Sequence, residues 1–112
     1  MFFAIYRIEK PLVALRYMEL SLKSDLENNA PLSHTASTKL NICAILSTLE
    51  RHSEALVFAS EAVKHLFDTI ADIHDPTKSN QYVNVDQSIL YNTLTVALFN
   101  LGVENEHLKD FE

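Results

Sequence analysis

The sequence is poor in residues that interrupt helices and in cysteine. It contains one glycine and three prolines among 112 residues, and this scarcity favours helices over a turn-rich sheet protein. A single glycine is also too few for a glycine-rich phosphate-binding loop. The one cysteine, Cys43, leaves no partner for an intrachain disulfide, which predicts a reducing compartment.

A basic excess and a long apolar run are missing as well. Fifteen acidic residues against nine basic ones give a formal charge of -6, which predicts that the chain binds neither nucleic acid nor an anionic membrane surface. No segment approaches the roughly 18 to 20 consecutive apolar residues of a membrane helix. Residues 1–7 lack the basic region of a signal peptide. We therefore expect a soluble, cytoplasmic protein.

The sequence does contain apolar residues at helical spacing. A hydrophobic content of 47% is typical of a packed globular protein, and the length corresponds to one domain or to a piece of a larger one. Apolar residues recur three or four positions apart, whereas no segment shows the period of two expected of a half-buried strand. These patterns predict an all-α fold of about five helices.

Residues that start or stop helices set the expected boundaries. Pro11 is expected to open a helix, Ser53 to cap one, and Gly102 to end one. Residues 77–84 form the only long polar segment, which predicts a loop. The expected segments are a short apolar phrase over 2–8 and helices over 12–26, 33–49, 53–73, 86–101 and 103–112.

The helical phrases are similar to one another. In each of three places a large apolar residue stands seven positions before a leucine that opens the next apolar stripe: Ile8 and Leu15, Leu49 and Leu56, Leu101 and Leu108. Small residues also recur seven positions apart, at Ala55 and Ala62. Small residues on one face of a helix allow a neighbouring helix to approach closely. The pattern predicts repeated helical hairpins.

This pattern resembles the tetratricopeptide repeat (TPR), in which a helix A with a small residue is followed by a tight turn and a helix B with two spaced alanines. The middle unit matches at Ile42, Cys43, Leu46, His52, Ala55 and Ala62, and the last unit matches at Tyr91, Leu94, Thr95, Gly102 and Phe111. Departures from the family pattern are Lys39, Cys43, Glu50 and His107.

The repeat spacing is longer than in the ordinary family. Ala14 and Ala55 are 41 residues apart, and Ala55 and His107 are 52 apart, against about 34 for the ordinary repeat. The first spacing is similar to the lengthened repeats of kinesin-light-chain-like proteins. The resemblance implies a right-handed solenoid with a partial repeat over 1–30, a complete repeat over 33–75 and a partial repeat over 85–112. Because a solenoid needs about three repeats, we expect a fragment or one edge of an array, with Phe2, Phe3 and Phe111 as uncovered core residues.

No cluster of residues favours catalysis or metal binding. The histidines at 34, 52, 65, 74 and 107 do not form a metal-ligand pattern and are expected on the surface or between helices. Cys43 lies on an apolar face and is expected to be a buried packing thiol. The carboxylates of Glu54, Glu61 and Asp68 share one stripe, which predicts a solvated face. We expect no cofactor and no enzyme activity; a small helical enzyme or metal protein is the least favoured alternative.

The family resemblance implies a partner-binding groove lined by helix-A side chains. Its expected residues are Ser37, Leu40, Asn41, Ala44, Ser47 and Thr48 in the middle repeat, and Ile89, Asn92, Thr93, Val96, Phe99 and Asn100 in the last. Family members that hold a chaperone's C-terminal carboxylate use lysine, asparagine and arginine there, whereas this chain has Leu40, Ala44 and Val96. That clamp is therefore absent, and the groove is expected to be neutral. The alternative is that many of these residues face the next helix.

Two functions follow as expectations. The first is a non-catalytic scaffold that binds a partner peptide or helix in the groove. The second is a structural subunit of a larger assembly that packs, or associates with itself, through apolar repeat ends. Similar degenerate repeats occur in scaffold proteins, some of them ciliary, so a ciliary or cytoskeletal location is a weaker expectation beside the cytoplasm.

Overall fold

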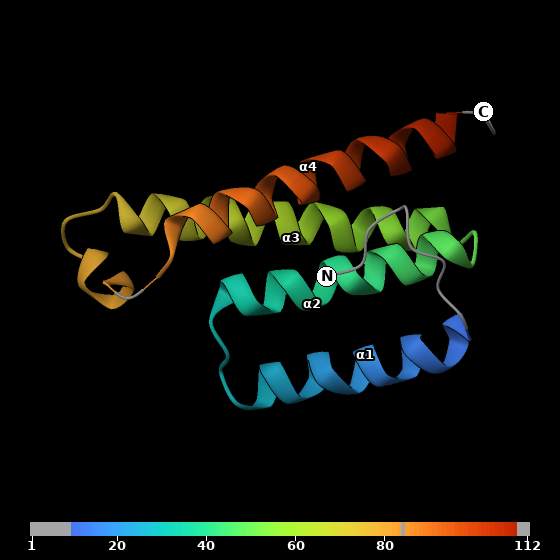
Figure 1. Cartoon of the computed structure of the whole chain (residues 1–112), viewed down its shortest axis with the longest axis horizontal. Helices are drawn as coiled ribbons and strands as arrows, with labels where there is room; N and C mark the ends of the chain where they lie inside the picture. Colours follow the sequence, from blue (N-terminus) through green and yellow to red (C-terminus); the bar gives the residue numbers. More distant parts are fainter. Residues whose placement is uncertain (1–9, 84, 110–112) are drawn as a thin grey trace.

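Four α-helices and one short 3-10 helix make up the described fold. The computed structural model describes residues 10–83 and 85–109, and within these ranges it contains helices and no strand. The elements are α1 (Pro11–Glu27), α2 (Leu32–Thr48), α3 (His52–Ile73), η1 (Ser79–Tyr82) and α4 (Gln87–Lys109) (Figure 1). The all-α prediction is confirmed.

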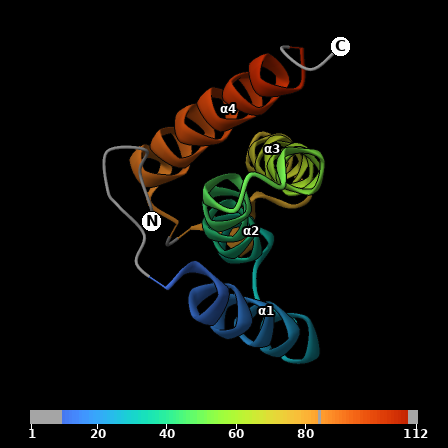
Figure 2. The same ribbon diagram turned by 90° about the vertical axis from the view of Figure 1, so that its right-hand side faces the viewer.

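Helix α2 lies at the centre of the arrangement. It contacts α1 on one side and α3 and α4 on the other, and α3 in turn contacts α4 and η1. Helix α1 contacts α2 alone among these elements. Viewed from the end, α1 and α4 lie on opposite sides of α2 (Figure 2). The outermost helices therefore each have a side without a neighbouring helix in the described part of the chain.

Local sequence explains the ends of the first two helices. Pro11 stands in the first turn of α1. An N–H group in the first turn has no acceptor within the helix, so the N–H that proline lacks costs no hydrogen bond there. Asn29 has a left-handed φ of 53° after α1, and Glu50 has a φ of 60° between α2 and α3. Asparagine accepts this conformation more readily than most residues. The helix ends predicted at residues 26 and 49 are confirmed to within one residue, since α1 ends at Glu27 and α2 at Thr48.

Apolar burial divides into two clusters that share α2 and α3. The first joins α1, α2 and α3 and is built on Leu15, Ile42, Cys43, Ile45, Leu46, Ala55 and Ala59. The second joins α2, α3 and α4 and is built on Ala36, Leu40, Ala62, Leu66, Leu90, Leu94 and Ala97. Ala55, Ala59 and Ala62 have no exposed surface, so the small stripe of α3 allows close packing, as predicted.

The prediction of about five helices, with a break at Gly102, is wrong. Helix α4 continues through Gly102 to Lys109, although glycine inside a helix costs about 0.5 to 1 kcal/mol relative to alanine. Packing offsets this cost, because Leu101 packs against the first cluster and Glu104 is buried. The described part of 85–112 thus holds one long helix and no hairpin. The short phrase expected over 2–8 lies outside the described residues.

Two further local predictions need correction. Ser53 is not the N-cap of α3, because the helix begins at His52 and Arg51 takes the cap position without a side-chain capping hydrogen bond. The predicted loop over 77–84 contains the helical turn η1. Its Tyr82 hydroxyl donates a hydrogen bond of 3.1 Å to Asp72 of α3, and this contact ties the turn to the helix before it.

Candidate functional site

The least buried stripe of α2 is polar and runs along the helix. Ser37, Asn41 and Ala44 are half-buried, and Thr48 is exposed. Spacings of four, three and four residues place these side chains on one face. The same face carries none of the large apolar residues that fill the two clusters. This stripe is therefore the surface that α2, the central helix, presents outside the core.

Helix α4 contributes the second side of the site. Thr93 is buried, Val96 and Asn100 are half-buried, and Asn92 is exposed. Thr93, Val96 and Asn100 follow one another at spacings of three and four, so they share a face of α4 next to its packed residues. Helices α2 and α4 are in contact, and we call their two partly buried stripes together the α2/α4 groove.

A hollow of about 270 Å³ opens between the first halves of the two helices. Ser37 and Thr93, both expected in the groove, lie in its wall together with Ile89. The full lining is Ser33, His34, Ser37, Leu66, Val85, Asp86, Ile89, Leu90 and Thr93. The structure thus brings together residues that are 56 positions apart in the sequence, Ser37 and Thr93.

The hydroxyl groups along the groove donate to their own helices. Ser37 donates to the Ser33 carbonyl at 3.3 Å, Thr93 to the Ile89 carbonyl at 2.8 Å, and Thr48 to the Ala44 carbonyl at 3.0 Å. A hydroxyl oxygen that has donated its proton still accepts hydrogen bonds through its lone pairs. These groups can therefore accept from N–H donors of a bound peptide backbone.

Two of the expected groove residues lie elsewhere. Leu40 is 1% exposed and belongs to the second core cluster, so it packs between helices and does not line the groove. Phe99 is 62% exposed, but it lies beside Leu98 and Gly102 on the outer face of α4. Ser47 is half-buried at the margin of the α2 stripe. The family resemblance implied that α2 and α4 line one groove, but the residue pattern could not fix which side of each helix the core covers.

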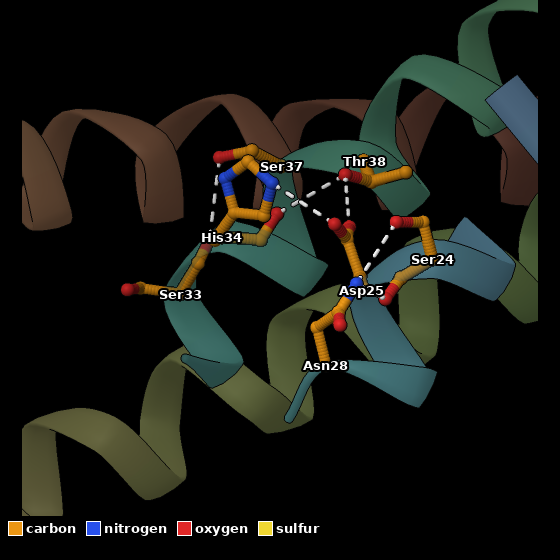
Figure 3. A network of polar contacts seen from close by, with 7 residues as sticks. All are labelled: Ser24, Asp25, Asn28, Ser33, His34, Ser37 and Thr38. Carbon is orange, nitrogen blue, oxygen red and sulfur yellow. Dashed lines mark hydrogen bonds and ion pairs between the residues drawn. The ribbon is translucent and has the colours of Figure 1, made fainter. Parts of the chain in front are cut away.

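A polar network that the sequence did not predict joins α1 to the start of α2 (Figure 3). Asp25 of α1 is 9% exposed. Its carboxylate accepts a hydrogen bond of 2.9 Å from the Thr38 hydroxyl and lies 3.2 Å from Nε2 of His34. Nearby, the Asn28 amide donates to the Ser24 carbonyl at the end of α1. Asp25 thus contacts two side chains of α2, Thr38 and His34. The network therefore holds α2 against α1 and positions His34, which lines the hollow.

A second polar contact links the α2–α3 turn to the far half of α4. Nδ1 of His52 lies 2.7 Å from the carboxylate of Glu104, and Glu104 is 2% exposed. The His52 ring also stacks on His107 with a centroid separation of 4.1 Å. A buried carboxylate requires such a partner. This contact ties the second half of α4 to the first residue of α3.

Cys43 and the acidic stripe of α3 lie close to where the sequence predicted them. Cys43 is 1% exposed, and burial, with a smaller effect of the Glu104 charge, raises the pKa of its thiol to about 12. It is therefore a protonated packing thiol at neutral pH, as predicted. Of the acidic stripe on α3, Glu54 and Asp68 are exposed, and Glu61 is half-buried beside Lys39 at 3.2 Å.

His65 of α3 is half-buried beside Lys39 of α2. Burial lowers its pKa, and the charge of Lys39 lowers it further; the Lys39 ammonium lies 2.9 Å from Nε2 of this ring. His65 and His52 both lie between helices, in agreement with the surface-or-interhelix prediction. Among the described residues, no group of three or more histidine, cysteine or acidic side chains is arranged to hold a metal ion.

Comparisons with protein-family models, curated proteins and solved structures found no match to this chain. The resemblance to the tetratricopeptide repeat therefore rests on the residue pattern alone. Within the described residues, no helix has the length and apolar character needed to cross a membrane.

Proposed function

We propose that this chain is a non-catalytic protein-interaction module of TPR-like helical hairpins, which binds a partner peptide or helix in the α2/α4 groove. The observation that carries the proposal is the meeting of the α2 and α4 stripes over the hollow between Ser37 and Thr93. The order of helix contacts supports the repeat assignment. Each helix packs on the next, and α2 also contacts α4, which in such repeats would be the helix A of the following unit.

The chemistry of the groove favours a neutral, extended partner. Its central side chains are hydroxyl, amide and small apolar groups, represented by Ser37, Asn41 and Ala44. The side chain of Asp86 at the hollow caps α4 through the Ser88 N–H at 2.9 Å, so part of its charge is already engaged. Hydroxyl acceptors suit backbone N–H groups, and the small side chains leave room for side chains of the partner.

Selection from a displayed peptide library tests the proposal. Peptides selected on the unaltered chain should bind it, and Ala44→Arg should weaken that binding at least about tenfold, because it places a long charged side chain in the groove. Ala71→Arg is the matched control, since Ala71 is exposed on α3. Titrations followed by fluorescence anisotropy give the Kd values. If both variants lose the same affinity for the peptide, or if neither variant loses any, the groove is not the binding site.

The second function, assembly through end faces, is favoured by a different observation. Helices α1 and α4 each expose large apolar side chains on the side that no described element covers, including Leu12, Tyr17 and Phe99. The groove and these outer faces are separate surfaces, so the two functions can be tested separately.

A further inference from the structure

Each outermost helix carries a compact exposed patch centred on apolar residues. We define the α1 patch as Leu12, Val13, Arg16, Tyr17 and Leu20. We define the α4 patch as Leu98, Phe99, Gly102, Val103, Glu106 and His107. Leu12 and Tyr17 are each 68% exposed, and Phe99 is 62% exposed. Large apolar surfaces rimmed by polar groups often mark sites of protein interaction.

The two patches face away from each other across the molecule. On α1 the patch lies opposite Leu15 and Met18, which pack toward α2. On α4 the centre of the patch, Phe99, lies opposite Leu94 and Ala97, which pack in the second cluster, whereas His107 at the patch edge stacks on His52. Since α1 and α4 flank α2 on opposite sides (Figure 2), one molecule cannot bring its own two patches together. Contact between them requires a second copy.

Gly102 gives the α4 patch a notch that packing among the residues 10–83 and 85–109 does not explain. It is the only glycine of the sequence and stands inside a 23-residue helix. A Cβ added there would meet no atom of the described residues within 4 Å, so packing among these residues leaves room for a side chain at position 102. A glycine on an exposed helix face permits close approach by another helix. Leu98, Phe99 and Val103 surround the notch.

The charges of the two patches are complementary. The charged member of the α1 patch is Arg16, for which no ion pair is found within the described part of the chain. The charged member of the α4 patch is Glu106, whose contact with Lys109 is long at 4.0 Å. Between these patches, an α1–α4 contact can pair Arg16 with Glu106, whereas an α1–α1 contact offers no carboxylate and an α4–α4 contact offers no arginine. Opposite charges favour α1 against α4.

We propose that the α1 patch of one copy docks on the α4 patch of the next, with an apolar α1 side chain such as Tyr17 seated at Gly102 and Arg16 beside Glu106. This inference rests on the second proposed function and does not use the α2/α4 groove. The contact is head-to-tail, so it leaves one free patch at each end and generates open chains of copies. The patches hold far fewer residues than the about 20 to 30 per side of a standard interface. The association is therefore weak and concentration-dependent.

Light scattering on the full chain provides the test. Between about 10 μM and 1 mM the mean mass should rise continuously without a limit at the dimer, as expected for a weak contact. Tyr17→Glu blocks the α1 patch and Phe99→Glu blocks the α4 patch, so each variant alone should remain monomeric. An equal mixture should form a 1:1 dimer, because each variant retains one intact patch. Phe67→Glu is the matched control and should still associate, since Phe67 is exposed on α3.

Two further substitutions test the notch and the charge pair. Gly102→Ala should raise the thermal midpoint of the monomer, because alanine favours the helix, and should weaken association because it fills the notch. Arg16→Glu should weaken association about fivefold, and adding Glu106→Arg should restore it. Retention of the total helical signal by circular dichroism confirms that each variant is folded.

Three outcomes would overturn the proposal. If the full chain stays monomeric at about 1 mM, the α1–α4 contact between copies does not form even as a weak association. A blocked variant that dimerises by itself would show like-with-like pairing. A mixture of the two blocked variants without heterodimer would show that α1 does not meet α4. None of these results bears on peptide binding in the groove, which Ala44→Arg tests by itself.

Discussion

At the residue scale, the polar side chains buried between helices decide how the helices meet. Glu104 is 2% exposed and Asp25 is 9% exposed, and each has a partner on another element, His52 and Thr38 respectively. No buried side-chain N or O atom in the described part of the chain lacks a hydrogen-bond partner. Such contacts are directional, so they specify a crossing geometry that apolar burial alone leaves adjustable.

The His52–Glu104 contact should contribute measurably to stability. Glu104→Ala removes the carboxylate that His52 faces at 2.7 Å and leaves a small void, so we expect the free energy of unfolding to fall by about 2 to 4 kcal/mol. Urea denaturation followed by circular dichroism measures the change. Asn105→Ala is the matched control on the adjacent, exposed position and should cost less than about 0.5 kcal/mol. If Glu104→Ala and Asn105→Ala lower the free energy of unfolding by similar amounts, the His52–Glu104 contact does not stabilise the fold.

At the element scale, the helices differ in how firmly they are held. Helix α1 contacts α2 alone among the described elements and buries only Leu15 and Asp25, whereas α2 buries eight of its seventeen residues. Most helical stability in proteins comes from packing and not from intrinsic propensity. Among the four α-helices, α1 is thus the one that can open at the lowest free energy.

Hydrogen exchange should reveal this difference. Central amides of α1 are expected to exchange at least about tenfold faster than central amides of α2, because α1 can separate from α2 while the other helices stay packed. Exchange followed by NMR or by mass spectrometry at low protein concentration measures the two sets within one sample. Equal protection of both helices would mean that α1 opens only when the whole molecule unfolds.

At the scale of the whole molecule, α2 and α3 couple the two apolar clusters. Ile45 lies in the first cluster and Leu66 in the second, and both have no exposed surface. Since both helices run through both clusters, loss of one cluster removes the support of the other. The described fold should therefore unfold as one cooperative unit, apart from the local opening of α1.

Core truncations in the two clusters test this coupling. Ile45→Ala and Leu66→Ala should each lower the free energy of unfolding by about 2 to 5 kcal/mol and leave one transition that is shared by circular dichroism and tyrosine fluorescence. Leu26→Ala is the control, because Leu26 is 62% exposed. Two separate transitions in either core variant would show that the clusters unfold independently.

The parts of the fold that could be predicted from the sequence are mainly those that depend on neighbouring residues in the chain, such as helix ends. Pro11 at the start of α1 acts on its immediate neighbours, so its effect is readable from sequence. The failure at Gly102 has the opposite cause. The cost of a glycine is local, but the packing of Leu101 and Glu104 that outweighs it depends on α2 and α3.

The sequence by itself determined the helical class, the main helix ends and a packing role for Cys43, because each depends on spacing or on residue type. Only the tertiary structure decided that Leu40 is buried while Ser37 faces a hollow, that Asp25 meets Thr38, and that the faces of α1 and α4 remain uncovered. These features depend on how each helix is rotated about its axis and on what lies beside it. That rotation is fixed by all the contacts of the helix together, so no single segment of the sequence contains it.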